Sequence, residues 1–234
     1  IEDVDPELSE TLHQWNGRKP FTISALQGLP KGGGRTPYLK AGWECWLRVT
    51  TLGNRIFQPL MQHFLLGKSQ AKIRLGSLNF GISQVLTTPN SHTWADYVEA
   101  EKLLQEAEPT QTLTLDFTSP TRFHIKGYYA IMPMPKLVFG SLATKWNAFL
   151  EPGLDREAIE QVAQKVLVTS YNLRSRTWYW KRRPRKGFTG RCTYNLERLP
   201  SEEQKRFSAL ADFALYGGVG GKTTQGMGQC RRLA

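Results

Sequence analysis

The sequence has few residues from which covalent or metal-based cross-links could be built. It holds three cysteines, widely spaced and never in a CxxC pair, and four histidines without HxxH or HExxH spacing. A disulfide framework and a structural zinc site both need paired or regularly spaced ligands, so neither is expected. Odd, scattered cysteines are typical of a reducing cytosol, which predicts a cytoplasmic location. We expect neither a metal ion nor another cofactor.

The chain also lacks long apolar stretches. No run approaches the roughly 18 apolar residues that a membrane-spanning helix requires, so no membrane partner is predicted. A basic segment followed by an apolar one is not visible at Ile1, which argues against a signal peptide. The 40% of hydrophobic and 22% of charged residues are ordinary for a globular protein and argue against wholesale disorder.

Acidic residues are scarce relative to basic ones, and the net charge is +11. Such an excess attracts polyanions, so nucleic acid is the first partner to expect; a basic but indifferent surface is the alternative. The segment "RSRTWYWKRRPRKGFTGR" (174–191) combines basic and aromatic residues and contains no acid. Cations for phosphates beside flat rings for bases favour RNA. The cations expected to bind RNA, at a hairpin tip or long strand end, are Arg174, Arg176, Lys181, Arg182, Arg183, Arg185 and Lys186.

The order of expected elements predicts two similar halves. In the second half, strands are expected within 112–125 (interrupted at Pro120), 163–180, 186–196 and 228–234, and helices over 137–150 and 200–216 with Ser201 as N-cap. This β-α-β-β-α-β order is the ferredoxin-like unit. The first half shows a helix over 5–15, strands over 19–26 and 43–52, a helix over 54–67, one or two strands within 71–88 and a linking helix over 94–107.

The first half therefore matches the same unit without its opening strand, and we expect that strand to lie before Ile1. The predicted fold class is α+β, with two tandem ferredoxin-like domains. Their expected bounds are 1–108 and 109–234.

A glycine-rich stretch, "YGGVGGKTTQGMGQ" (216–229), raises the question of a nucleotide-binding loop. A Walker loop needs a glycine five residues before Gly-Lys-Thr, and here that position is Tyr216. Such a loop also opens a helix, whereas only eleven residues follow Thr223 and they read as a short strand. A nucleotide-dependent switch is therefore disfavoured. The glycines can instead bring backbone N–H groups close to RNA phosphates, or simply allow tight packing.

The loop has the form G-x-G-x-x-T-x-x-G-x-G and closes the second predicted domain. It resembles the signature of the CRISPR-associated endoribonucleases that cut precursor CRISPR RNA within its repeats, the sixth Cas family of the repeat-associated RNA-binding superfamily. The segments "LHQWNGRKPFTISAL", "LRVTTL", "TLTLDFTSPTRF", "MPMPKLVFGSLATKW" and "GFTGRCTYNL" are similar to that family in the same order.

The resemblance implies which residues do the chemistry. The family's catalytic histidine and lysine match His13 and Lys19, and an assisting tyrosine found in several relatives would lie before Ile1. Histidine suits proton transfer because its unperturbed pKa, about 6.5, is near working pH. The expected reaction is attack by the RNA's own 2′-hydroxyl, without metal, giving a 2′,3′-cyclic phosphate and a 5′-hydroxyl. The loop residues expected to hold RNA phosphates are Gly218, Gly220, Lys222, Thr223 and Gly226.

Several alternatives stay open at this point. His13 could cap a helix C-terminus, Arg18 could replace Lys19 as the cation, and Ser24 could donate to a phosphate. Trp178 and Trp180, which alternate on one strand face, could be buried against a helix or stack on RNA. The whole protein could be a non-catalytic subunit that holds the repeat-derived part of a guide RNA. Expected partners are the precursor RNA repeat, which can form a stem-loop, and candidates beyond it are other Cas subunits and a second copy of the chain.

Overall fold

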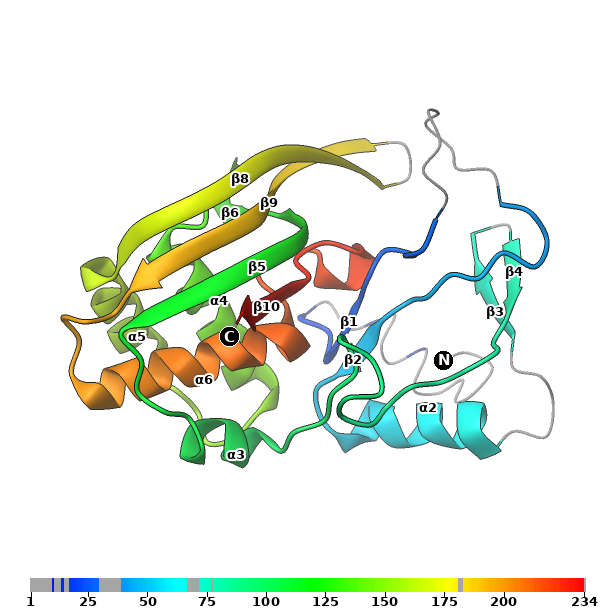
Figure 1. Cartoon of the computed structure of the whole chain (residues 1–234), viewed down its shortest axis with the longest axis horizontal. Coiled ribbons are helices and arrows are strands. Elements are labelled where there is room, and N and C mark those ends of the chain that lie inside the picture. Colours follow the sequence, from blue (N-terminus) through cyan, green and yellow to red (C-terminus); the bar gives the residue numbers. More distant parts are fainter. Residues whose placement is uncertain are drawn as a thin grey trace.

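The computed structural model describes residues 10, 14, 17–29, 39–66, 72–76, 78–180 and 183–233. Its second half is built on a four-stranded antiparallel sheet with the order β10-β5-β9-β8 (Figure 1). The strands are β5 (Thr112–Thr121), β8 (Leu167–Trp180), β9 (Arg183–Asn195) and β10 (Cys230–Leu233). Two long helices, α4 (Pro135–Phe149) and α6 (Ser201–Gly217), connect them in the ferredoxin-like order that the sequence predicted.

One face of this sheet and the two helices enclose the core. Side chains alternate along β5, so that Leu113, Leu115 and Phe117 are buried while their neighbours point to the other face. Helix α4 contributes Trp146, whose ring lies 5.2 Å from that of Phe213 on α6 in an edge-on arrangement. In the described part of the chain, the long helices α4 and α6 pack on this face, and alternate residues of β5 point to the opposite one.

The first half consists of shorter pieces. Strands β1 (Phe21–Ile23) and β2 (Val49–Thr51) form an antiparallel pair, followed by helix α2 (Asn54–Leu66), the hairpin β3 (Lys72–Leu75) and β4 (Leu78–Gly81), and helix α3 (Ala100–Gln105). Ile56 of α2 is buried against Phe21 and Leu60, as the helical spacing predicted. The relatively short strands give this half a smaller core than the second half.

Smaller elements complete the second half. These are the hairpin β6 (Phe123–Ile125) and β7 (Tyr128–Ala130), helix α5 (Arg156–Val162), and the 3-10 turns η1 (Ala163–Lys165) and η2 (Thr223–Gln225). Neither β7 nor α5 was among the elements predicted from the sequence. Asp155 marks the start of α5, because its carboxylate accepts a hydrogen bond of 3.0 Å from the Ala158 N–H.

Three local predictions need correction. The expected helix over 94–107 is helical only in α3, because the Trp94 carbonyl and the Asp96 carboxylate are engaged by other parts of the chain. Strand β5 continues through Pro120 instead of breaking there, although its pairing with β9 shifts register between Phe117 and Thr121. Ser201 is the first residue of α6 and makes no capping bond; Pro200 precedes it.

Buried polar contacts join the two halves. Arg48, next to β2, donates through Nε to the Trp94 carbonyl (2.7 Å) and through Nη1 to the Leu215 carbonyl (2.7 Å) at the end of α6. Thr50 donates to the Tyr216 carbonyl (2.7 Å), and burial lowers the pKa of Arg48 to about 10. Because the bonds to Leu215 and Tyr216 end on the last turn of α6, they fix β2 and its partner β1 beside the start of the glycine-rich loop.

Candidate nucleic-acid interface

The glycine-rich loop is the turn between α6 and β10, where the sequence placed it. Gly218, Gly220, Gly226 and Gly228 have φ between 63° and 84°, a region that other residues rarely adopt. At Gly220, an added Cβ would stand 2.4 Å from the Arg122 carbonyl oxygen. The glycines are therefore needed for close backbone packing, which was one of the two alternatives left open by the sequence.

Most N–H groups of the loop are used inside the protein. Val219 donates to the Gly228 carbonyl (2.8 Å), Gly221 to the Arg122 carbonyl (3.0 Å), and Gly220 to the hydroxyl of Ser141 (3.2 Å). These bonds hold the loop in one shape. Its tip differs, because Lys222 is exposed with φ 64° and is followed by the half-buried Thr223. The tip is the part of the loop that can reach an external phosphate.

A buried lysine binds the start of the glycine-rich loop. Lys145 of α4 donates two hydrogen bonds of 2.9 Å from Nζ, one to the Gly217 carbonyl and one to the Gly218 carbonyl. Burial and then the charge of Arg18 lower the pKa of Lys145 to about 7. Arg18 therefore lies within electrostatic reach of the loop's start, although its own side chain is exposed.

The segment that follows the predicted catalytic residues runs along the loop. Ser24, one residue beyond β1, forms a parallel bridge with Gly226, and an added Cβ on Gly226 would stand 3.3 Å from the Ala25 nitrogen. Lys19 is half-buried and lies two residues before β1. His13 lies outside the described residues. The hydroxyl of Ser24 donates to the Ala25 carbonyl (2.8 Å) and accepts from the Arg48 N–H (2.9 Å), so it is engaged within the protein.

Strands β8 and β9 form a long arm that projects past β5 toward the first half (Figure 1). Residues paired across the two strands share a face, which places Arg174, Arg176 and Arg185 together on the face away from the helices. Lys186 pairs with Thr177 and lies on the other face, and Arg183 is exposed near the end of the arm. The predicted residues Lys181 and Arg182 lie outside the described residues.

Trp178 connects the arm to the loop. An added Cβ on Gly226 would stand 2.9 Å from Trp178 Cζ2, so the indole lies directly on the loop, a contact that neither alternative for Trp178 included. Its Nε1 is buried without a hydrogen-bond partner among the described residues. Glycine loop, arm and the segment from Lys19 to Ala25 therefore meet in one place. Trp180 has a side chain outside the described part of the structure.

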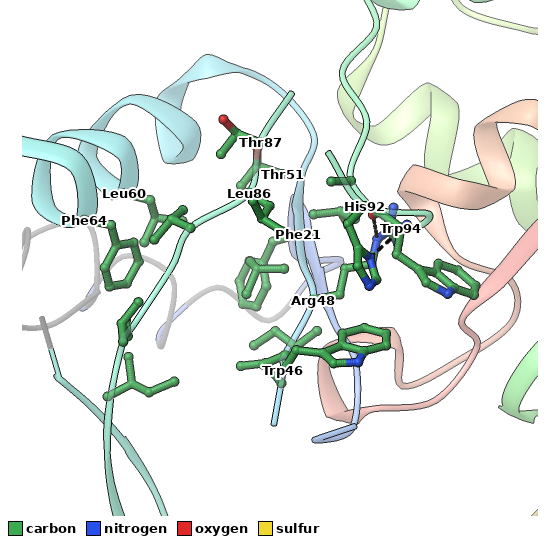
Figure 2. A pocket seen from close by; sticks show the side chains of 18 of the residues that line it. Phe21, Trp46, Arg48, Thr51, Leu60, Phe64, Leu86, Thr87, His92 and Trp94 are labelled. Carbon is green, nitrogen blue, oxygen red and sulfur yellow. Dashed lines mark hydrogen bonds between the residues drawn. The ribbon is translucent and has the colours of Figure 1, made fainter. Parts of the chain in front are cut away.

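The first half also contains a hollow of about 1820 Å³ beside α2 and β2. Figure 2 shows that mostly hydrophobic side chains line it, among them Phe21, Leu60 and Phe64. Two of its polar residues bond within the protein: Arg48 as described above, and His92, whose Nδ1 accepts the Trp94 N–H at 3.1 Å.

Two other histidines, and any side chains that could bind a metal, can be located within the described residues. His63 is half-buried beside Phe64, and His124 is exposed next to Tyr129 on the β6–β7 hairpin. No group of histidine, cysteine or acidic side chains suited to a metal is found in the described residues. Within them, too, no helix has both the length and the apolar character to cross a membrane.

One arginine beside the glycine-rich loop was not predicted from the sequence. Arg122 follows β5 directly, its carbonyl anchors Gly221, and its guanidinium lies over the ring of Tyr129 at 3.6 Å from the centroid. A single arginine between "TSPT" and "FHI" carries no signal in the sequence. Its place beside the loop depends on the ferredoxin-like order of strands, which brings the end of β5 next to the residues after α6.

Comparison with known proteins gives a consistent result. A family model described as CRISPR-associated endoribonuclease Cas6 matches residues 115–230, and one described as the CRISPR Cas6 N-terminal domain matches residues 1–105. A CRISPR-associated endoribonuclease Cas6 of Streptococcus thermophilus is 30% identical over 234 residues, covering 97% of this chain and 86% of that protein.

Solved structures are similar over nearly the whole chain. A Cas6 product complex has a TM-score of 0.83 at 31% identity and covers 99% of this chain and 88% of the other. A Cas6 complex with a substrate mimic has a TM-score of 0.75 at 30% identity and covers 97% and 88%.

Proposed function

Because the chain belongs to the Cas6 family of CRISPR-associated endoribonucleases, we propose that it cuts precursor CRISPR RNA within the repeats by a metal-independent reaction. The relatives solved with product and with a substrate mimic support repeat RNA as the ligand. The domain bounds expected from the sequence, 1–108 and 109–234, remain predictions.

In the proposed reaction, the 2′-hydroxyl next to the cut attacks the adjacent phosphorus and the bond from phosphorus to the 5′-oxygen breaks. His13 transfers a proton as general acid or base, a role that typically contributes about 10²- to 10⁴-fold. Lys19 stabilises the negative charge that develops on the phosphorane. The products are a 2′,3′-cyclic phosphate and a 5′-hydroxyl.

One observation carries the proposal: the bridge between Ser24 and Gly226. It puts the strand that Lys19 leads into against the glycine-rich loop of the other half, so groups from both can act on one linkage. The exposed Lys222 and neighbouring Thr223 then hold a phosphate near the cut, while Gly218, Gly220 and Gly226 shape the loop. This division of roles follows from the bonding of the loop's N–H groups.

The arm holds the repeat away from the cut. Arg174, Arg176 and Arg185 on one face, with Arg183 and Lys186 near its end, contact backbone phosphates, and Lys181 and Arg182 are assigned the same role from the sequence. Phosphate contacts give affinity and register but little choice of sequence. Binding should therefore weaken steeply as salt rises.

The test uses repeat RNA in two forms, all-ribose and with a single 2′-deoxy at the cut site, in buffer containing EDTA. We expect the ribose substrate to be cut and the 2′-deoxy substrate to be bound but left intact. Cutting of the 2′-deoxy RNA, or loss of cutting in EDTA, would contradict the proposed chemistry. Tight binding with no cutting of either RNA would instead favour a non-catalytic subunit.

A further inference from the structure

Two arginines beside the glycine-rich loop have no acidic partner among the described residues. Arg122 is only 6% exposed. The residue before it, Thr121, pairs with Phe188 of β9, which brings Arg185 of the same strand within electrostatic reach of Arg122. The Nε atoms of both are buried without a hydrogen-bond partner, and neither side chain forms a hydrogen bond or ion pair with any described residue. Burial lowers the pKa of Arg122, and the charge of Arg185 lowers it further. Two neighbouring guanidinium groups without a hydrogen-bond or ion-pair partner favour the binding of an anionic ligand.

An aromatic surface continues from this pair. The guanidinium of Arg122 covers one side of the Tyr129 ring, yet Tyr129 remains 51% exposed. His124 pairs with Tyr129 across the β6–β7 hairpin, and their ring centroids are 5.3 Å apart. Residues 122–136 contain no acid. Basic and aromatic groups combined in this way are typical of surfaces that bind single-stranded nucleic acid.

The neighbouring Tyr128 provides a contrast. It is 80% exposed and pairs with Ile125, so it points to the opposite face of the same hairpin, away from Arg122 and His124. Two adjacent tyrosines thus differ in whether a cation accompanies the ring. If RNA bound any exposed aromatic residue, both tyrosines would contribute to binding. A defined subsite would involve Tyr129 and not Tyr128.

We propose that Arg122, Arg185, Tyr129 and His124 form a subsite for one unpaired nucleotide of the RNA outside the cut linkage. Its phosphate binds the two guanidinium groups, and its base stacks on the exposed side of Tyr129 next to His124. The subsite lies directly behind the loop, because the Arg122 carbonyl accepts the Gly221 N–H. This inference rests on the proposed function, since an RNA held at the loop would have flanking nucleotides within reach.

The test uses a fluorescein-labelled 12-nucleotide oligouridylate carrying 5-iodouridine, which forms photoadducts with stacked aromatic residues. We expect the adduct to map to Tyr129 or His124, and Tyr129→Ala to weaken binding at least fivefold, the low end of stacking on one base. Tyr129→Phe should bind nearly as the parent does. Tyr128→Ala, the matched control, should also bind nearly as the parent does. Equal losses for Tyr128→Ala and Tyr129→Ala, or no adduct on the hairpin, would overturn the subsite; the latter would leave this surface for a protein partner.

A second variant separates binding from structure. Arg185→Gln removes one of two repelling charges, so the melting temperature should stay the same or rise while oligouridylate binding weakens and its salt dependence falls. A lower melting temperature with unchanged binding would show that the pair is structural, and the proposal would fail. Cutting of repeat RNA by the parent protein is measured in parallel. Absence of cutting together with a Tyr129 adduct would contradict the proposed function but leave the subsite standing.

Discussion

The two halves of the molecule are built from related elements but differ in how they are packed. The second half has a continuous core, in which Trp146 and Phe207 are fully buried and a four-stranded sheet has helices on one face. In its described residues, the first half has two-stranded pieces, a small cluster in which the partly buried Phe21 and Leu60 pack on the buried Ile56, and a large hollow. The proposed RNA-gripping residues lie mostly on the second half, and the proposed proton-transfer residue lies on the first.

This difference indicates how the site is kept in register. A well-packed half can hold the glycine-rich loop and the arm by itself. The first half depends on its junction, where Arg48 and Thr50 bind the end of α6. Loss of the junction should therefore disturb chemistry more than RNA binding, and loss of the arm should do the opposite.

The largest effect is expected for the chemistry assigned to the first half. His13→Ala should lower the cleavage rate about 10²- to 10⁴-fold, because proton transfer is lost, while RNA affinity changes little. Lys19→Ala should also lower the rate rather than the affinity. Single-turnover cleavage and filter binding measure the two quantities. Lys72→Ala, an exposed lysine of β3, is the control; a comparable loss there would remove the special role of Lys19.

The junction can be tested through Arg48. Arg48→Met leaves the carbonyls of Trp94 and Leu215 without their donor, which should destabilise the protein by about 3 kcal/mol. Urea unfolding measures this change, and cleavage should fall more than binding. The exposed Arg55→Met in the same half should be nearly neutral. Equal losses in the two variants would mean that the junction is not what holds the halves together.

The loop of the second half offers a matched pair of glycines. Gly220→Ala forces a Cβ within 2.4 Å of the Arg122 carbonyl at φ 74°, and should cost about 2–3 kcal/mol of stability together with RNA affinity. Gly221→Ala has that oxygen at 4.0 Å and no positive φ, so it should be tolerated. Thermal unfolding and RNA binding compare them; similar behaviour would show that loop shape does not matter.

Lys145 makes the second half sensitive to pH. Its pKa is 10.5 in its ordinary state and about 7 when folded, so between these values the unfolded chain binds a proton that the folded chain does not. The Lys145 contribution to stability should therefore rise with pH, by up to about 1.4 kcal/mol per pH unit. Lys145→Met should remove this rise. Urea unfolding from pH 6.5 to 9 checks it, and parallel curves for both proteins would contradict it.

The smallest effect is expected for single contacts of the arm. Replacing both Arg174 and Arg176 by alanine should reduce the slope of log affinity against log salt by about 1.4–1.8, since each phosphate contact contributes about 0.7–0.9. The cleavage rate of bound RNA should be nearly unchanged. Binding measured between 50 and 200 mM salt tests this, and an unchanged slope would show that the two arginines do not contact phosphates.

The difference in packing between the two halves also explains which elements could be predicted from the sequence. Regular alternation and helical spacing predicted the four sheet strands and the two long helices of the second half to within about four residues, because a large core imposes clear periodicity. The shorter β7 and α5 were not predicted. In the first half, the helix expected over 94–107 was mostly replaced by contacts of Trp94 and Asp96 with distant residues. Such contacts leave no local pattern.

The same limit applies to the candidate site. The loop glycines and the basic arm were recognisable because each is contiguous in the sequence. Arg122, Trp178 on Gly226, and Lys145 beneath the loop act through residues far away along the chain, and only the order of strands and helices brings them together. Trp178 was noticed in the sequence, but the loop was not among the partners considered for it.

The central claim is that one RNA linkage is reached by both halves. A crystal structure of the protein with repeat RNA blocked by a 2′-deoxy at the cut site tests it most directly. We predict that the scissile phosphate lies within about 3 Å of Lys19 Nζ and that the same or an adjacent phosphate contacts Lys222, with His13 in hydrogen-bond reach of the 2′ position or the leaving oxygen. A scissile phosphate bound at the glycine-rich loop but far from both Lys19 and His13 would contradict the account.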